Sequence, residues 1–368
     1  MSVPVTVPLV KVAMPARERL MPALEAVLYG GMIGEGEHVY EFERRFAATF
    51  GLPNVIATSS GTAALHLALE LAGVRSGDEV ITTAMTAEPT NTSILQVGAH
   101  PVFADVDPAS GCLDPADVAR CITSRTRAIV VVHYAGYPAR MDALRQIADQ
   151  HGVALVEDCA HALGARFGGR PVGAWGDFAI FSFQAIKHIT TVDGGLLALS
   201  DASRVDEARR LRWFGLAKGV PRTEVDITRV GYKYNMHNVA GVLGCLQLEH
   251  APALVAAHVA HGAAYDAAFA GLRRARPASS GPDAEPSYWL YTLLAEDSEA
   301  VEAALLAEGI QASKLHRPND RHTVFAPYRR ALAGLDAFYE SLMHVPCGWW
   351  VSEADRARII RVVQDVAQ

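Results

Sequence analysis

The chain has 368 residues, of which 50% are hydrophobic and 20% are charged. This balance is typical of a globular protein and excludes a disordered acidic or basic chain, and the length predicts a large and a smaller domain. The net charge of -7, with basic residues interspersed among acids, gives no basic field for a nucleic-acid partner.

The N-terminal segment is apolar but is interrupted by Pro4, Pro8, Lys11 and Pro15, so it lacks the continuous hydrophobic region of a signal peptide. No segment approaches the roughly 18 unbroken apolar residues that a membrane helix needs. We therefore expect a cytoplasmic protein without a membrane partner. The five cysteines are widely spaced and form no CxxC pair, which predicts reduced thiols and neither a disulfide framework nor a metal site.

Short apolar, β-branched runs alternate with helical patterns through the first half of the chain. The seven runs cover residues 54–58, 79–83, 101–107, 128–134, 153–158, 177–183 and 195–200. Such runs predict an α/β fold with a mostly parallel seven-stranded sheet sandwiched by helices. After the first run, the pattern over residues 61–73 predicts a helix that is entered through Ser59, Ser60 and Gly61 and stopped by Gly73.

The second half of the chain has a different organisation. An Ala/His-rich run over residues 250–272 predicts one long helix, and the Pro/Gly/Ser stretch over residues 273–287 marks an internal boundary. Patterns for a strand and two helices follow, and these predict a smaller α+β domain. We divide the chain into residues 1–250, an N-terminal arm with the large domain, and residues 251–368, the linking helix with the small domain.

One lysine stands out because the chain has only five. Lys187 follows an apolar run and precedes a Gly-rich turn. In an apolar cleft the charged form of a lysine is disfavoured, so its pKa falls and it becomes a nucleophile toward a carbonyl. Schiff-base formation is therefore the leading role for Lys187, and a surface lysine in a loop is the alternative.

The fifth apolar run ends in the carboxylate pair Glu157 and Asp158. Ligands of open α/β sheets bind beyond the carboxyl ends of strands. A carboxylate beside the pyridine nitrogen of pyridoxal 5′-phosphate (PLP) keeps that nitrogen protonated, so that the ring accepts electrons. Asp158 is the candidate for this role, and a helix N-cap or a solvated acid is the alternative.

Small residues form a turn between the first run and its helix. The backbone N–H groups of Ser60, Gly61 and Thr62 at a helix N-terminus can bind a phosphate, although an ordinary N-cap explains these residues equally well. The joint pattern is more informative. A phosphate turn, Asp158 and Lys187 occur in this order, each at a predicted strand end, and together they predict a PLP enzyme.

Six segments carry a more specific pattern: residues 38–51, 59–65, 98–108, 156–165, 176–195 and 231–250. On these segments the chain resembles the DegT/DnrJ/EryC1/StrS family of sugar aminotransferases, a branch of the aspartate-aminotransferase fold (PLP fold type I). The resemblance covers nearly the whole chain. It implies that Lys187 holds PLP as a Schiff base, that Asp158 contacts the pyridine nitrogen and that His161 lies near O3′ of the ring.

The resemblance also implies a wider binding set and a partner. The expected cofactor-binding residues are Ser60, Gly61, Thr62, Asp158, His161, Ser182, Gln184, Lys187, Lys233 and Asn235. Lys233 and Asn235 belong to the segment that the family delivers from a second subunit, which implies a homodimer with shared active sites. Taken without the family, both residues fit a polar turn before an amphipathic helix.

Some positions depart from the family pattern. Ala87 stands where many members place an aromatic residue that stacks on the pyridine ring, and His161 stands where Gln is frequent. Lys187 is present, whereas the related 3-dehydratases carry His there and release ammonia. The intact lysine therefore favours amino transfer over elimination.

The resemblance implies a ping-pong aminotransferase that takes an amino group from L-glutamate, passes through pyridoxamine 5′-phosphate (PMP) and aminates a keto sugar. Lys187 would move the proton, as general base and then general acid. The expected acceptor is a nucleotide-linked keto-deoxysugar, which His316, Arg317 and Tyr134 would contact.

Other activities remain as alternatives. A keto-cyclitol is a second acceptor, and a PLP-dependent sugar dehydratase or lyase and a non-catalytic binding protein are rivals on the same scaffold. A nicotinamide-dependent oxidoreductase lacks support, because the glycines at 34 and 36 do not follow a strand.

Overall fold

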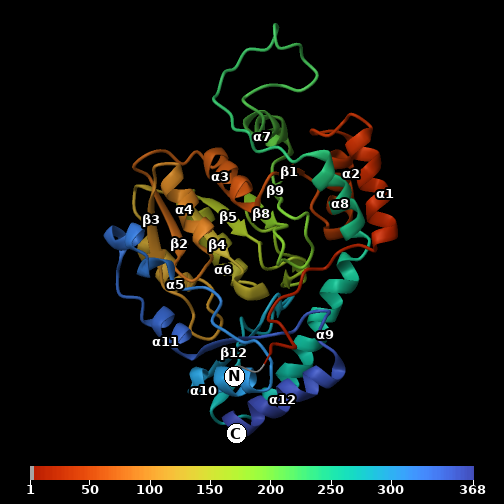
Figure 1. The fold of residues 1–368 in the computed structure, drawn as a ribbon. Coiled ribbons are helices and arrows are strands. Elements are labelled where there is room, and N and C mark those ends of the chain that lie inside the picture. Colours follow the sequence, from red (N-terminus) through yellow and green to blue (C-terminus); the bar gives the residue numbers. More distant parts are fainter. Residues whose placement is uncertain (1–3) are drawn as a thin grey trace.

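A seven-stranded sheet runs through the centre of the protein in a computed structural model that describes residues 4–368 (Figure 1). In order across the sheet, the strands are β1 (Val55–Thr58), β9 (Gly195–Leu199), β8 (Phe178–Ser182), β5 (Ala154–Asp158), β4 (Thr126–Val132), β2 (Glu79–Thr83) and β3 (His100–Ala104). Strand β9 runs antiparallel to both of its neighbours, β1 and β8, and all the other neighbouring pairs in this sheet are parallel. All seven predicted runs form these strands, so the predicted α/β fold is confirmed.

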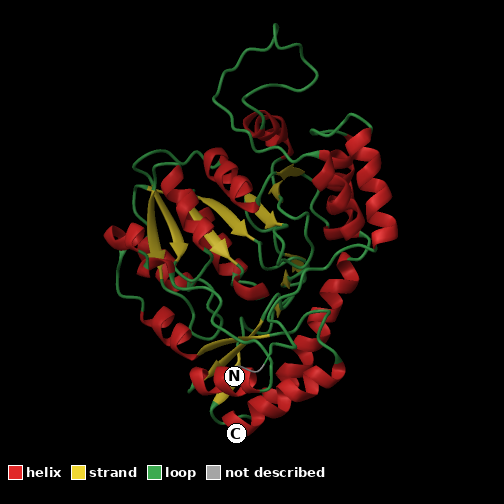
Figure 2. Ribbon diagram, in the orientation of Figure 1, coloured by secondary structure: helices red, strands yellow, loops and turns green. Residues whose placement is uncertain are grey.

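Helices cover both faces of this sheet (Figure 2). One face packs against α3 (Gly61–Leu71), α4 (Glu88–Gln96) and α7 (Val205–Arg212), and the other packs against α5 (Pro115–Cys121) and α6 (Met141–His151). Val130 and Val131 are successive residues of β4 that face opposite sides, and both are fully buried. This double burial explains why the runs are continuously apolar rather than alternating.

Helix α3 forms as the sequence predicts. The hydroxyl of Ser60 accepts a hydrogen bond from Ala63 N at 3.0 Å, which caps the helix. The helix ends at Leu71, and Gly73 then takes a φ of 78° that favours glycine. Because β1 ends at Thr58 and α3 begins at Gly61, the start of α3 lies directly beyond the end of β1.

Beside the β1 edge of the sheet pack α1 (Arg17–Tyr29), α2 (Glu37–Phe50) and α8 (Asn238–Leu248), and α9 (Ala251–Phe269) continues from α8 to the C-terminal part of the chain (Figure 1). Helices α2 and α8 approach closely, since a Cβ on Gly241 would lie 2.8 Å from the backbone of Val39. Helix α9 is the long helix expected near residue 250. Within residues 4–368, no single helix has the length and apolarity to cross a membrane, and only α8 and α9 taken together across their 56° bend would qualify.

The C-terminal part forms a smaller α+β unit. Its sheet contains β10 (Ala275–Pro277), β12 (Tyr291–Ala295) and β13 (Leu342–Val345), and its helices are α10 (Ser298–Ala307), α11 (Ala333–Ser341) and α12 (Glu353–Ala367). Val7 pairs with Ile310, so the N-terminal segment packs against this unit. The division at residue 250 stays a prediction, and residues 1–3 of the expected N-terminal arm lie outside the described residues.

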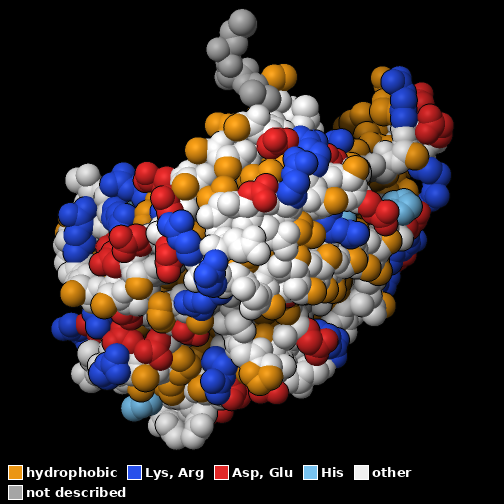
Figure 3. Space-filling view, turned by 90° about the horizontal axis from the view of Figure 1, so that it is seen from below, with side chains coloured by type: hydrophobic (Ala, Val, Ile, Leu, Met, Phe, Trp, Pro, Cys, Tyr) orange, Lys and Arg blue, Asp and Glu red, His pale blue; other side chains and the backbone are white. Residues whose placement is uncertain are grey.

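Short elements complete the chain. A third small sheet contains β11 (Ala284–Glu285), β6 (Arg166–Phe167) and β7 (Arg170–Pro171). The 3-10 helices are η1 (Tyr134–Gly136), η2 (Ala202–Arg204), η3 (Asn319–Arg321) and η4 (Thr323–Tyr328). On the face that Figure 3 shows, basic and acidic side chains are interspersed.

Candidate active site

A cavity of about 480 Å³ lies at the carboxyl ends of the central strands. Nine residues singled out from the sequence line it: Ser60, Gly61, Thr62, Asp158, His161, Ser182, Gln184, Lys187 and His316. These residues come together because β1, β5 and β8 all end at this edge of the sheet. Apolar side chains such as Leu65, Val132 and Ile180 complete the wall.

The small-residue turn at the start of α3 lies against the end of β8. A Cβ on Gly61 would lie 2.8 Å from Cβ of Ser182, so this contact requires glycine. The first N–H groups of a helix have no intrahelical acceptor. Gly61 and Thr62 occupy these positions and line the cavity, so their amides are suited to an anion.

Asp158 is a buried carboxylate at the end of β5, with a side chain that is 5% exposed. Its Oδ2 accepts a hydrogen bond from Thr90 Oγ1 at 2.8 Å, and its Oδ1 accepts one from Ala160 N at 3.1 Å. Burial raises the pKa of Asp158, while the two hydrogen bonds and the charge of Lys187 oppose this rise. The hydrogen bond from Ala160 N resembles a capping contact, which is the alternative role expected for Asp158. The carboxylate also lines the cavity, however, and is suited to a cationic ligand atom.

Lys187 lies in the loop after β8, where its backbone N–H donates to the carbonyl oxygen of Gln184 at 3.0 Å. Burial lowers the pKa of Lys187 to about 8, and the charge of Asp158 limits the fall. At pH 7 a pKa of about 8 leaves roughly a tenth of the amine neutral, far more than for an ordinary lysine, and the neutral amine is the nucleophile. This is the chemistry that the sequence context predicts for Lys187.

Aromatic rings gather beside Lys187. The ring of His161 stacks on Trp289, with centroids 4.1 Å apart and an interplanar angle of 19°, and lies parallel to His316 at 5.5 Å. Burial lowers the pKa of both histidines, that of His316 to about 4, so both rings are neutral. The Nδ1 atom of His161 is buried and has no partner within the described chain, so it is free to bind a ligand atom.

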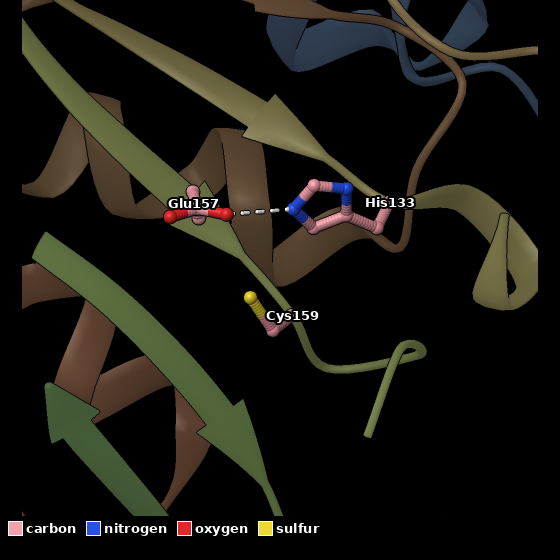
Figure 4. A group of neighbouring side chains, drawn as sticks. All are labelled: His133, Glu157 and Cys159. Atoms are coloured by element: carbon pink, nitrogen blue, oxygen red, sulfur yellow. Dashed lines mark hydrogen bonds and ion pairs between the residues drawn. The ribbon is translucent and has the colours of Figure 1, made fainter. Parts of the chain in front are cut away.

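Glu157 and Cys159, the chain neighbours of Asp158, lie with His133 in a second group of side chains that has a different character (Figure 4). His133 Nδ1 accepts from Ala139 N, so Nε2 carries the hydrogen and donates to Glu157 at 3.1 Å. The carboxylate of Glu157 also accepts three backbone N–H groups from residues 173–176. Burial raises the pKa of the nearby Cys159 well above its usual value. This group therefore fits a structural role, because protein donors occupy the carboxylate.

A larger cavity of about 740 Å³ lies between α2 and the segment around α7. It contains none of the residues singled out from the sequence. Its charges are mostly paired, since Glu43 binds Arg209 at 2.6 Å and Arg212 at 3.1 Å, and Glu35 binds Lys218 at 2.9 Å. Because these charged side chains already pair with one another, they are less available to a ligand.

Four residues expected at the site lie outside the cavity wall. The hydroxyl of Tyr134 is bound to His344 at 3.0 Å, behind His161, and Arg317 donates to the carbonyl oxygen of Arg321 at 3.1 Å. Lys233 and Asn235 are also absent from the wall, and they bind each other as Lys233 Nζ donates to Asn235 Oδ1 at 2.8 Å. The roles expected for these four residues stay predictions.

Three residues near the site have no distinctive signal in the sequence. Thr90 binds Asp158, and Glu88 lines the cavity beside Ala87. The ring centroid of Trp289 lies 4.1 Å from the Nζ atom of Lys187, although the two residues are distant in sequence. A Thr on a helix and a Trp in a strand pattern are ordinary core residues, and only the tertiary structure brings them to the site.

Comparison with known proteins agrees with this geometry. The pattern of the DegT/DnrJ/EryC1/StrS aminotransferase family matches residues 15–364. Sugar aminotransferase CalS13 from Micromonospora echinospora is 36% identical, with a TM-score of 0.94 over 98% of this chain and 100% of the other. AtS13 from Actinomadura melliaura is 35% identical, with a TM-score of 0.95 over 99% of this chain and 100% of the other.

A third relative bears on the cofactor. The sugar aminotransferase Spr1654 from Streptococcus pneumoniae, described as putative, has been solved in a PLP form and a PMP form. Its PLP form is 27% identical, with a TM-score of 0.88 over 100% of this chain and 98% of the other. The family match, the likeness of fold and the cofactor forms of a relative lead to one conclusion: the chain belongs to the DegT/DnrJ/EryC1/StrS family and is a PLP-dependent sugar aminotransferase.

Proposed function

We propose that the protein transfers an amino group from L-glutamate to a nucleotide-linked keto-deoxysugar. The observation that carries this proposal is that Lys187 and Asp158 line one cavity together with the N-terminus of α3. A nucleophilic amine, a buried carboxylate and an anion site at a strand edge are the features that amino transfer with PLP needs. Retention of Lys187 favours transfer over release of ammonia.

The residues of the cavity fit PLP. The free amides of Gly61 and Thr62, with the hydroxyl of Ser182, are suited to its phosphate. The buried carboxylate of Asp158 is suited to a protonated pyridine nitrogen, and the unpartnered Nδ1 of His161 is suited to the ring hydroxyl. Lys187 would bind the cofactor covalently through its amine.

When bound, PLP supplies a carbonyl carbon that receives the amino group and a ring that accepts electrons. The chain supplies the acid and base. Since burial lowers the pKa of Lys187 to about 8, its amine can take a proton from the substrate carbon and return it at neutral pH. The carboxylate of Asp158 would stabilise positive charge on the bound group.

A direct test of this function uses the two half-reactions. PLP-loaded protein mixed with L-glutamate alone should form one equivalent of 2-oxoglutarate per site, because a ping-pong enzyme stops there. A nucleotide-linked keto-deoxysugar added next should become an aminosugar that mass spectrometry detects. Release of free ammonia, or turnover of a keto-cyclitol in preference to every keto sugar, would contradict the proposal.

Asp158→Asn separates the carboxylate's charge from its hydrogen bonds. The charge of Asp158 raises the pKa of Lys187, so its loss should move that pKa below about 8. The pH at which PLP attachment to the cofactor-free protein reaches half its maximal rate should therefore fall. The glutamate half-reaction should slow on the order of 100-fold or more, because a developing charge loses its partner.

Thr90→Val is the matched control for Asp158→Asn. It removes one hydrogen bond from Asp158 but keeps the charge, so the pH midpoint of PLP attachment should move much less. Equal midpoints for wild type and Asp158→Asn would show that Asp158 does not act on Lys187.

We also propose a homodimer in which Lys233 and Asn235 serve the cavity of the partner. The segment between α7 and α8 extends away from the body of the protein (Figure 1) and exposes Val220, Ile227 and Val230. Exposed apolar side chains on a protruding loop favour contact with another protein surface. Lys233 and Asn235 follow this loop, which places them to reach a second subunit.

Mixing two inactive variants tests the shared site. Lys187→Ala and Asn235→Ala should each be inactive alone as purified dimers. After subunits are exchanged, activity should return to roughly a quarter of the wild-type sites, since half of the dimers are mixed and each restores one site. Asn235→Ala with full activity, no recovery on mixing, or a monomer in light scattering would each contradict the shared site.

A further inference from the structure

Trp289 joins the C-terminal part of the chain to the loop that carries Lys187. Its indole Nε1 donates a hydrogen bond to the carbonyl oxygen of Ile186 at 2.9 Å. The Nζ atom of Lys187 lies 4.1 Å from the centroid of the indole ring, and Trp289 is only 2% exposed. One buried side chain therefore contacts both the peptide before Lys187 and the amine itself.

We propose that Trp289 is a positioning residue for Lys187: it fixes the peptide that carries the lysine, and its ring face receives the ammonium group. This inference rests on the proposed role of Lys187 in binding PLP and moving the proton. A second hydrogen bond supports it, because His188 Nε2 donates to the carbonyl oxygen of Ser287 at 3.1 Å. Both chain neighbours of Lys187 are thus held by residues 287–289.

Residues 287–289 are themselves held in place. Leu290 N donates to the carbonyl oxygen of Ala135 at 3.2 Å, and Ser287 N donates to that of Gly136 at 3.0 Å. Gly136 has a φ of 98°, and a Cβ there would lie 2.6 Å from Trp289 N, so only glycine fits. Tyr288 has a φ of 45°, which is a strained backbone for this residue and persists only where the surroundings fix it.

The ring also balances the charge on Lys187. The face of an indole carries partial negative charge and favours an ammonium group, most strongly where water is excluded. Among the described residues, the charge of Asp158 raises the pKa of Lys187, and His161, His188 and His316 lie near enough for the charge of the lysine to lower their pKa values. Burial keeps the three histidines neutral, so Asp158 and the Trp289 face are the features of the described site that favour the ammonium. Without the ring, the freed lysine would hold its proton less well.

The test measures Lys187 directly in the cofactor-free full chain. Its five lysines are dimethylated with ¹³C-formaldehyde, which leaves each amine titratable, and are followed by NMR, with Lys187 assigned by its loss in Lys187→Arg. In Trp289→Leu the pKa of Lys187 should fall by about one unit, because burial remains and the ring face is lost. In Trp289→Phe, which keeps a ring but loses the N–H donor, it should change much less.

The loaded enzyme supplies a second readout. The glutamate half-reaction of Trp289→Phe should slow about tenfold at every pH, because the peptide between Ile186 and Lys187 is less firmly oriented. The midpoint of its pH dependence should stay unchanged. Trp350 is the matched control, since its Nε1 donates to the carbonyl oxygen of Pro8 at 2.9 Å, away from the cavity. Trp350→Leu and Trp350→Phe should change neither the pKa of Lys187 nor the rate of the glutamate half-reaction.

Fluorinated tryptophan provides a variant of unchanged shape if Trp289→Leu does not fold. Fluorine withdraws charge from the ring face, so the pKa of Lys187 should fall, while that of Lys314, which lies over Tyr339, should not. A Lys187 pKa that is unchanged by both Trp289→Leu and fluorination, or moved equally by Trp350→Leu, would overturn the proposal. PLP attachment to another lysine would instead overturn the proposed function, since the NMR titration needs no cofactor.

Discussion

The burial of the Lys187 amine close to the carboxylate of Asp158 is the interaction on which the rest of the site depends. A buried amine loses its charge easily, and a buried carboxylate gains protons easily, so each group limits the pKa shift of the other. The fold can maintain this pair because β5 and β8 end at the same edge of a sheet that is covered on both faces. The N-terminus of α3, beyond β1, adds backbone amides that are suited to an anion at that edge.

The C-terminal part completes the site from the other side. Trp289 and His316 both come from beyond residue 250, and with His161 they form a cluster of rings beside Lys187. Burial keeps both histidine rings neutral, so in our proposal the groups that favour the ammonium of Lys187 are Asp158 and the indole face. The C-terminal part thus supplies part of the surroundings of Lys187, since His316 lines the cavity and Trp289 contacts the amine.

Much of this arrangement was predictable from the sequence, because its signals are local. Each of the seven apolar runs forms a strand, Ser60 caps α3, and strand-end positions place Asp158 and Ser182 beside Lys187. The parts that were not predictable depend on tertiary contacts. Because Tyr134 follows β4, the sequence places it among the expected site residues. Its hydroxyl is hydrogen-bonded to His344, however, and the residue does not line the cavity. Trp289 resembles a core residue in a strand pattern, and only the packing of the C-terminal part against the Lys187 loop reveals its contacts.

The most direct test of the central claim is to trap the cofactor on the protein. PLP-loaded protein is reduced with borohydride and digested, and the modified peptide is identified by mass spectrometry. We expect the adduct on Lys187 alone among the five lysines and no adduct from Lys187→Ala. An adduct on a different lysine of the wild type, or no adduct at all, would show that Lys187 does not hold PLP.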